Sequence, residues 1–242
     1  TRLEALSFAR ATAQVLAAIE EAGLAHCDIS ASNVIINPTT GRAHLIDIED
    51  LYAPAFDPPA ALPAGTDGYA HSTASGGLWC AEADRFAGAV IVAEMAAWHD
   101  PRIRKQAEEE HYFSPSEMQQ DCPRYRLMRE VLADLDAWLA ELFDLAWFSQ
   151  TLADCPRLSE WQEVVNRVHH SVEVAGVVTA WRPLAAPGVE PAAEPRPIQP
   201  PHQPPPAAAP EQEPLPIVPQ FTPPPAPRPA PGTQVIQPTL PP

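Results

Sequence analysis

Apolar residues recur every three or four positions over residues 3–17, the spacing of a helix that buries one face. The set comprises Leu3, Leu6, Ala9, Ala13, Leu16 and Ala17. Gly23 follows at a position suited to the end of this helix, because glycine readily takes the left-handed backbone that ends many helices. The pattern therefore predicts an amphipathic helix in the first part of the chain.

The pattern then changes to that of two short strands. Residues 33–37 form an apolar run rich in β-branched side chains, and residues 43–47 return as a second strand. The turn sequence between them contains a proline and Gly41, which is free to adopt positive φ. We expect an antiparallel hairpin here.

The register of this hairpin decides which side chains meet. If Asn37 pairs with Ala43, Asn33 lies opposite Asp47, with the two Cα atoms about 5 Å apart. One metal ion could then contact both side chains. Asp28 lies just before the hairpin, in the loop that leaves the first helix. An Asp, a following Asn and a second Asp beyond a hairpin are residues that can hold a nucleotide's metal ions beside a base.

Three later segments have helical patterns. Residues 83–97 are apolar on nearly all sides, which predicts a helix in the middle of the domain. Residues 125–147 and 158–170 have the pattern of amphipathic helices, whereas the proline-containing stretch 49–64 predicts irregular structure. The expected core residues of the two amphipathic helices are Trp138, Leu139, Leu142, Phe143, Trp161, Val164 and Val165.

Composition divides the chain near Trp181. Most of the 32 prolines lie beyond it, and because proline lacks a donor and fixes φ, this part should be extended and disordered. We therefore expect a mainly α domain with a small β-hairpin at residues 1–180, followed by a proline-rich disordered tail at 181–242. The tail is interpreted as a spacer; a docking site for proline-recognition modules is the alternative.

Charge and cysteine usage narrow the class of protein. The chain has 242 residues, 45% of them hydrophobic, which suffices for one good core, and its net charge of −16 argues against a nucleic-acid partner. The four cysteines lack CxxC spacing, so neither a zinc site nor a disulfide framework is indicated, and we expect a reducing, cytoplasmic location. Apolar runs are too short for a membrane segment.

Four features, in chain order, resemble the larger C-terminal lobe of the protein kinase-like superfamily, in particular its bacterial-type serine/threonine kinases. His26–Asn33 is similar to the catalytic loop, and Asp47–Glu49 to a variant of the metal-binding Asp-Phe-Gly. Gly65–Tyr69 resembles the Gly-Thr-x-x-Tyr end of the activation segment, and Asp84–Met95 the buried central helix. A weaker resemblance follows in Pro156–Trp161, which is similar to the turn before the last helix.

The resemblance implies a phosphotransferase that uses ATP and Mg²⁺ and acts on a protein substrate. Asp28 would accept or orient the proton of the substrate hydroxyl. Asn33 and Asp47 would bind the nucleotide's Mg²⁺, which prefers oxygen ligands.

The resemblance also implies supporting roles. Thr66 would hydrogen-bond near Asp28 and fix it, as part of the catalytic set. His26 and Asp84 would be structural and would attach the loop to the core. On sequence grounds alone, His26 is a satisfied core histidine and Asp84 a helix N-cap, and both readings are compatible with these roles.

The chain departs from the family pattern where positive charge is usual. Ser30 and Ser32 occupy positions where protein kinases usually have a Lys or Arg near the transferred phosphate, and Cys27 replaces a phosphate-binding Arg. Residues 70–73 lack the usual Pro-Glu, so Arg157 loses its buried partner and should be partly exposed or paired elsewhere. The smaller N-terminal lobe, with its glycine-rich loop and strand lysine, is expected outside this chain.

A regulatory expectation follows from the same departures. Residues 48–64 contain no Ser or Thr, and the Arg that would bind an activating phosphate is replaced by Cys27. The hypothesis is that this segment is not switched by Ser/Thr phosphorylation.

Three functions remain open on the sequence. The first is phosphoryl transfer from ATP to protein Ser/Thr hydroxyls. The second is an aminoglycoside-kinase-like small-molecule phosphotransferase, because such enzymes share the His-x-Asp…Asn loop. The third is a pseudokinase that binds or scaffolds without chemistry, for which Ser30, Ser72 and Thr73 are the support.

Overall fold

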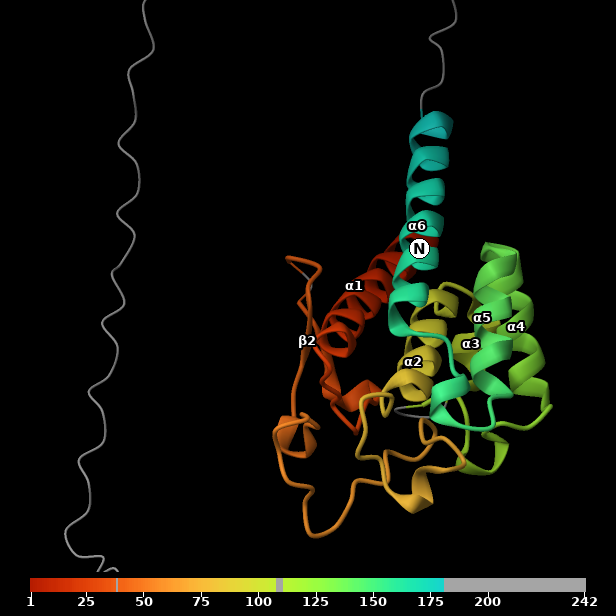
Figure 1. Ribbon diagram of the computed structural model, residues 1–242. Coiled ribbons are helices and arrows are strands. Elements are labelled where there is room, and N and C mark those ends of the chain that lie inside the picture. Colours follow the sequence, from red (N-terminus) through yellow and green to blue (C-terminus); the bar gives the residue numbers. More distant parts are fainter. Residues whose placement is uncertain (38, 108–110, 181–242) are drawn as a thin grey trace, which may run out of the picture. The chain divides into compact units, whose positions relative to one another are not determined.

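The computed structural model describes residues 1–37, 39–107 and 111–180, with backbone only for 177–180 (Figure 1). All of them belong to one unit, Thr1–Pro187. The proline-rich segment 181–242 lies outside the described residues, and so do the predictions of disorder, a spacer and a docking site.

The described chain is mainly helical with a two-stranded antiparallel sheet, as the sequence predicted. The helices are α1 (Arg2–Glu21), α2 (Arg85–Ala97), α3 (Pro101–Gln106), α4 (Pro123–Leu135), α5 (Ala137–Trp147) and α6 (Leu158–Ala180). The strands are β1 (Val34–Ile36) and β2 (Ala43–Leu45). Single 3₁₀ turns are found at Ala31–Asn33, Ile48–Asp50, Ala74–Gly76, Pro115–Glu117 and Leu152–Asp154.

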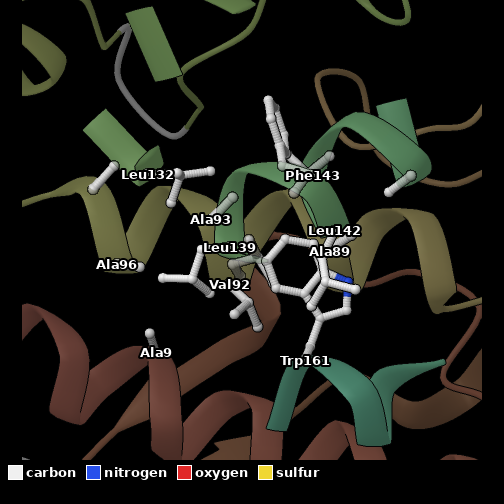
Figure 2. Packing of buried hydrophobic residues seen from close by; sticks show 14 of the residues in the cluster. Ala9, Ala89, Val92, Ala93, Ala96, Leu132, Leu139, Leu142, Phe143 and Trp161 are labelled. Atoms are coloured by element: carbon white, nitrogen blue, oxygen red, sulfur yellow. The ribbon is translucent and has the colours of Figure 1, made fainter. Parts of the chain in front are cut away.

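Helix α2 is the centre of the core. Ten of its thirteen residues are buried, as expected for a helix that is apolar on nearly all sides. It packs against α1, α4, α5 and α6. Figure 2 shows side chains of these helices gathered around it, among them Ala9 of α1, Leu132 of α4, Leu139 of α5 and Trp161 of α6.

Glycine allows α1, α2 and α6 to approach closely. A Cβ atom on Gly88 would lie 2.5 Å from Cδ2 of Leu158 and 3.2 Å from Cδ1 of Leu16. A partly buried ion pair joins the same three helices, since Arg85 donates to Glu20 at 2.5 Å and the other carboxylate oxygen of Glu20 accepts from the N–H of Leu158 at 2.8 Å. Both features fix where α6 begins against α1 and α2.

The predicted helix at 125–147 is instead two helices, α4 and α5. Asp136 separates them in an extended conformation, and its carboxylate accepts from the N–H of Trp138 at 2.8 Å, which begins α5. The break turns Trp138 outward. It is 57% exposed, so its assignment to the core was wrong, whereas Leu139 and Phe143 are fully buried as expected.

Candidate active site

Two backbone N–H groups attach the loop after α1 to the start of α2. The N–H of His26 donates to Oδ2 of Asp84 at 2.6 Å, and the N–H of Cys27 donates to Oδ1 at 2.8 Å. Asp84 is the N-cap residue of α2, as predicted, but its side chain makes no capping bond to α2 and binds the loop instead. Burial raises the pKa of Asp84 to about 6, although the two N–H groups act in the opposite direction.

Two side chains donate hydrogen bonds to the carboxylate of Asp28, one distant in sequence and one close to it. Thr66 donates its hydroxyl to Oδ1 at 2.6 Å, across 38 positions of sequence. The side-chain amide of Asn33 donates to Oδ2 at 3.1 Å and to the Asp28 carbonyl oxygen at 2.8 Å. These bonds fix the orientation of Asp28, which keeps partial exposure to solvent.

The register of the hairpin differs by one residue from the predicted one. Val34 pairs with Leu45 and Ile36 with Ala43, so the residue opposite Asn33 is Ile46 rather than Asp47. The turn closes one residue early because the Asn37 side chain accepts from the N–H groups of Thr39 and Thr40, at 2.9 and 3.0 Å. Because a slip of one residue exchanges the two faces of a strand, Asn33 and Asp47 do not face each other across the hairpin.

Asp47 nevertheless has an unusual backbone. It follows the ladder directly in the left-handed region, with φ 55° and ψ 56°, and precedes the 3₁₀ turn Ile48–Asp50. A non-glycine residue rarely adopts this conformation, and such residues are frequent at functional sites. Its side chain is exposed and accepts no hydrogen bond from the described residues.

The donor set suits Mg²⁺ better than a transition metal. Asn33 uses its amide hydrogens on Asp28, which leaves its amide oxygen without a hydrogen bond from the described residues. Asp47, which directly follows the hairpin partner of Asn33, offers an exposed carboxylate. Mg²⁺ takes few protein oxygens and retains waters and phosphate oxygens. No group of three or more His, Cys, Asp or Glu suited to a metal is found within 1–37, 39–107 and 111–180.

His26 has a structural environment. It is fully buried, and its Nε2 lies 2.7 Å from the carbonyl oxygen of Ile46, next to Asp47. Its Nδ1 is buried without a partner among the described residues. The ring therefore connects the loop after α1 to the end of the hairpin and is not accessible to solvent.

The structure brings no Lys or Arg of the described residues to the cleft beside Ser30 and Ser32. Ser30 is 1% exposed, and its hydroxyl lies 2.9 Å from that of Ser32. A small cleft beside Thr66 is lined by Asp67, by His111 and by uncharged residues. No Lys or Arg among the described residues lines it. Ser30 is thus bonded within the loop instead of being directed at a phosphate.

A neutral network replaces the usual Pro-Glu after Tyr69. His71 is 3% exposed, and its ring nitrogens lie 2.8 Å from Oγ1 of Thr73 and 3.2 Å from Oγ of Ser149. Gln119 accepts from the N–H of Ser72 and donates to the carbonyl oxygen of Ser149, both at 2.8 Å. Burial lowers the pKa of His71, which favours the neutral ring. Arg157 is exposed, as expected.

A buried contact that sequence reasoning missed links this segment to α2. The hydroxyl of Tyr69 donates to Oε2 of Glu94 at 2.8 Å, and the N–H of Tyr112 donates to Oε1 at 3.2 Å. Burial raises the pKa of Glu94 to about 7. The only sequence signal was a glutamate inside an otherwise apolar helix.

A scan of known protein families finds no match to the chain, and no curated protein matches it. Among the residues that the structure describes, no helix is both long and apolar enough to span a membrane.

Proposed function

We propose that this chain carries the catalytic-loop half of an ATP- and Mg²⁺-dependent phosphotransferase that acts on Ser or Thr hydroxyls of proteins. The observation that supports it best is that two side chains far from each other in sequence, Thr66 and Asp84, both bind the loop that carries Asp28. Thr66 fixes the Asp28 carboxylate, and Asp84 fixes the loop backbone just before it. A carboxylate so oriented can accept a hydroxyl proton.

Each residue has a defined part in this proposal. Asp28 orients the acceptor hydroxyl and takes its proton, and Thr66 keeps the carboxylate in one orientation. Asn33 and Asp47 would supply oxygen ligands to the Mg²⁺ of the nucleotide. When bound, the metal ion neutralises charge on the phosphates. His26 and Asp84 support the loop without contacting substrate.

The test is transfer of the γ-phosphoryl group of radiolabelled ATP by the protein at its natural length, with Mg²⁺ and a mixed protein substrate. Label released as phosphoserine and phosphothreonine on acid hydrolysis supports the proposal. Label found only on small molecules would assign the site to the aminoglycoside-kinase type, and absence of any label contradicts phosphoryl transfer.

A binding module without chemistry is the second candidate, because Ser30 is buried and supplies no charge. The two are separated by thermal stability measured with and without Mg²⁺–ATP, alongside the transfer assay. Stabilisation rises with ligand concentration above Kd. Stabilisation together with transfer supports the phosphotransferase, whereas stabilisation without transfer supports the binding module.

A further inference from the structure

Helix α5 carries a stripe of large apolar side chains that are exposed to solvent. Trp138, Leu145 and Phe148 are 57%, 54% and 48% exposed. Together with the exposed Glu141 they follow one another at intervals of three and four residues, which places them on one side of the helix. The other side of α5 packs against α2, α4 and α6. Contiguous apolar surface of this kind marks sites of interaction.

A cleft of about 270 Å³ continues the α5 stripe at the end of the helix. Phe148 lines it, together with Ser72 and the exposed side chains of Gln120 and Gln150. The side chains of Ser72 and Gln120 form no hydrogen bond with the described residues, and no charged side chain of those residues lines the cleft. The cleft therefore combines an aromatic ring with amide and hydroxyl groups that can donate to a ligand.

Contacts beneath the surface hold the stripe and the cleft together. Tyr125 packs edge-on against Phe148, with ring centroids 5.1 Å apart. The indole N–H of Trp147 donates to the carbonyl oxygen of Gln120 at 2.9 Å, which attaches the end of α5 to the wall of the cleft. A surface that is ordered before binding loses less conformational entropy when a ligand arrives.

Glu141 places a negative charge between the apolar side chains of the stripe. It is exposed and forms no ion pair with the described residues. The net charge of −16 adds to the attraction for a positive group. Two copies of the stripe are a poor match for each other, because pairing about a twofold axis would bring the two Glu141 carboxylates close together. The surface therefore suits a ligand with a positive group between two apolar ones.

A proline-rich strand has the repeat and the polarity that this surface requires. In polyproline II, residues three positions apart lie on one side, ~9.3 Å from each other. Trp138 and Leu145 are seven residues apart on α5, which corresponds to ~10.5 Å along the helix axis. The carbonyl oxygens of polyproline II form no internal hydrogen bonds, so the cleft can donate to them. A helical ligand would use its carbonyl oxygens internally.

We propose that the α5 stripe and the cleft at its end bind a proline-rich strand of a partner protein, with an arginine that pairs with Glu141. Prolines on either side of the arginine pack against Trp138 and Leu145. Carbonyl oxygens of the strand accept from Ser72 and Gln120. Grooves lined by aromatic side chains recognise polyproline II by these contacts. The binding does not depend on phosphoryl transfer, so the two proposals can fail separately.

The probe is a short, fluorescently labelled synthetic peptide with two prolines three residues apart and an arginine between them. It is titrated into the full chain while its anisotropy is recorded. A peptide with serines in place of the prolines should bind at least about tenfold more weakly. A peptide with alanine in place of the arginine should bind about two- to fivefold more weakly. Added NaCl should weaken only the peptide that contains arginine.

Two tryptophan variants form a matched pair. Trp138→Ala should weaken binding of the peptide by at least about tenfold, while circular dichroism shows that the variant keeps its helices. Trp98→Ala, which changes a tryptophan that is 47% exposed at the end of α2, should bind as the unmodified chain does. Glu141→Gln should lose both the preference for arginine and the dependence on NaCl.

Three results would overturn the proposal. They are equal binding of the proline and serine peptides, unchanged binding by Trp138→Ala, and no binding of the probe at millimolar concentration. Sedimentation of the full chain without peptide tests the other occupant. Self-association that Trp138→Ala abolishes would assign the α5 stripe to a second copy of the chain and would also overturn the proposal, whereas a monomer is expected.

Discussion

At the scale of single residues, the carboxyl groups of Asp84 and Glu94 attach different segments of the chain to α2. Asp84 precedes α2 and accepts hydrogen bonds from two N–H groups of the loop after α1. Glu94 lies three residues before the end of α2 and accepts from one N–H and one phenol O–H. Burial raises the pKa of both groups. Each therefore favours folding in its protonated form and opposes it when ionised.

This predicts a pH dependence of stability for Glu94. Its pKa rises from 4.5 to about 7 on folding, so its contribution is complete below pH 4.5 and is lost as the pH rises through 7. Glu94→Gln can still accept from Tyr112 and donate to Tyr69. The free energy of unfolding of the unmodified chain, measured in urea, should fall relative to that of the variant by up to about 3 kcal/mol between pH 4.5 and pH 8. Parallel pH profiles would contradict this.

The residues also show what sequence could and could not predict. The contact between Thr66 and Asp28 was expected from the family resemblance, and the structure contains it. The contact between Tyr69 and Glu94 was not expected, because nothing local in either segment specifies the other. Long-range polar pairs can be inferred only where a family pattern supplies the second partner.

At the scale of elements, close helix packing explains why α2 carries small residues. Gly88 faces Leu158 and Leu16 across distances that leave no room for a Cβ atom. By contrast, Gly176 on α6 is exposed and has no atoms near its Cβ position. Replacement of glycine by alanine should therefore have opposite effects on stability at Gly88 and at Gly176.

Gly88→Ala should destabilise the fold by about 1–3 kcal/mol, because overpacking outweighs the gain in helix propensity. Gly176→Ala should stabilise it by about 0.5–1 kcal/mol, since only the propensity changes. Thermal or urea unfolding of the two variants measures both effects. Stabilisation by Gly88→Ala would show that the three helices are not held as closely as described.

Element boundaries were harder to predict than element types. The hairpin was correct in kind, but its register was wrong because the Asn37 side chain closes the turn early. The helix break at Asp136 was missed because an Asp within an amphipathic pattern can be either a surface residue or a cap, and only the cap interrupts the helix. Trp138 was misplaced as a consequence.

At the scale of the whole molecule, two apolar clusters hold the segment between the hairpin and α2. Cys27 belongs to the smaller one, together with Ala25, Ala74, Leu78 and Ala83. Tyr52 packs edge-on against Trp79 with ring centroids 5.5 Å apart and pairs through its backbone with Ala25. Burial raises the pKa of the Cys27 thiol to about 12, so this group is a packing residue and carries no charge.

Residues 48–73 are therefore predicted to need no phosphate group for the protein to be active. Treatment of the natural-length protein with a phosphatase should leave its phosphoryl-transfer rate unchanged, because Cys27 is buried and offers no positive charge to a phosphate. The check is intact-mass mapping of residues 48–73 combined with the rate. An activating phosphate in that range would refute the prediction.

The central claim is that Asp28 acts on the acceptor hydroxyl, and one rate comparison tests it most directly. Phosphoryl transfer from Mg²⁺–ATP is measured for the natural-length protein, for Asp28→Asn and for Asp57→Asn, an exposed aspartate in the irregular stretch. Asp28→Asn should lower the rate by about 10²–10⁴ because the amide cannot take the proton, and Asp57→Asn should leave it unchanged. Equal rates for Asp28→Asn and the unmodified protein would contradict the account.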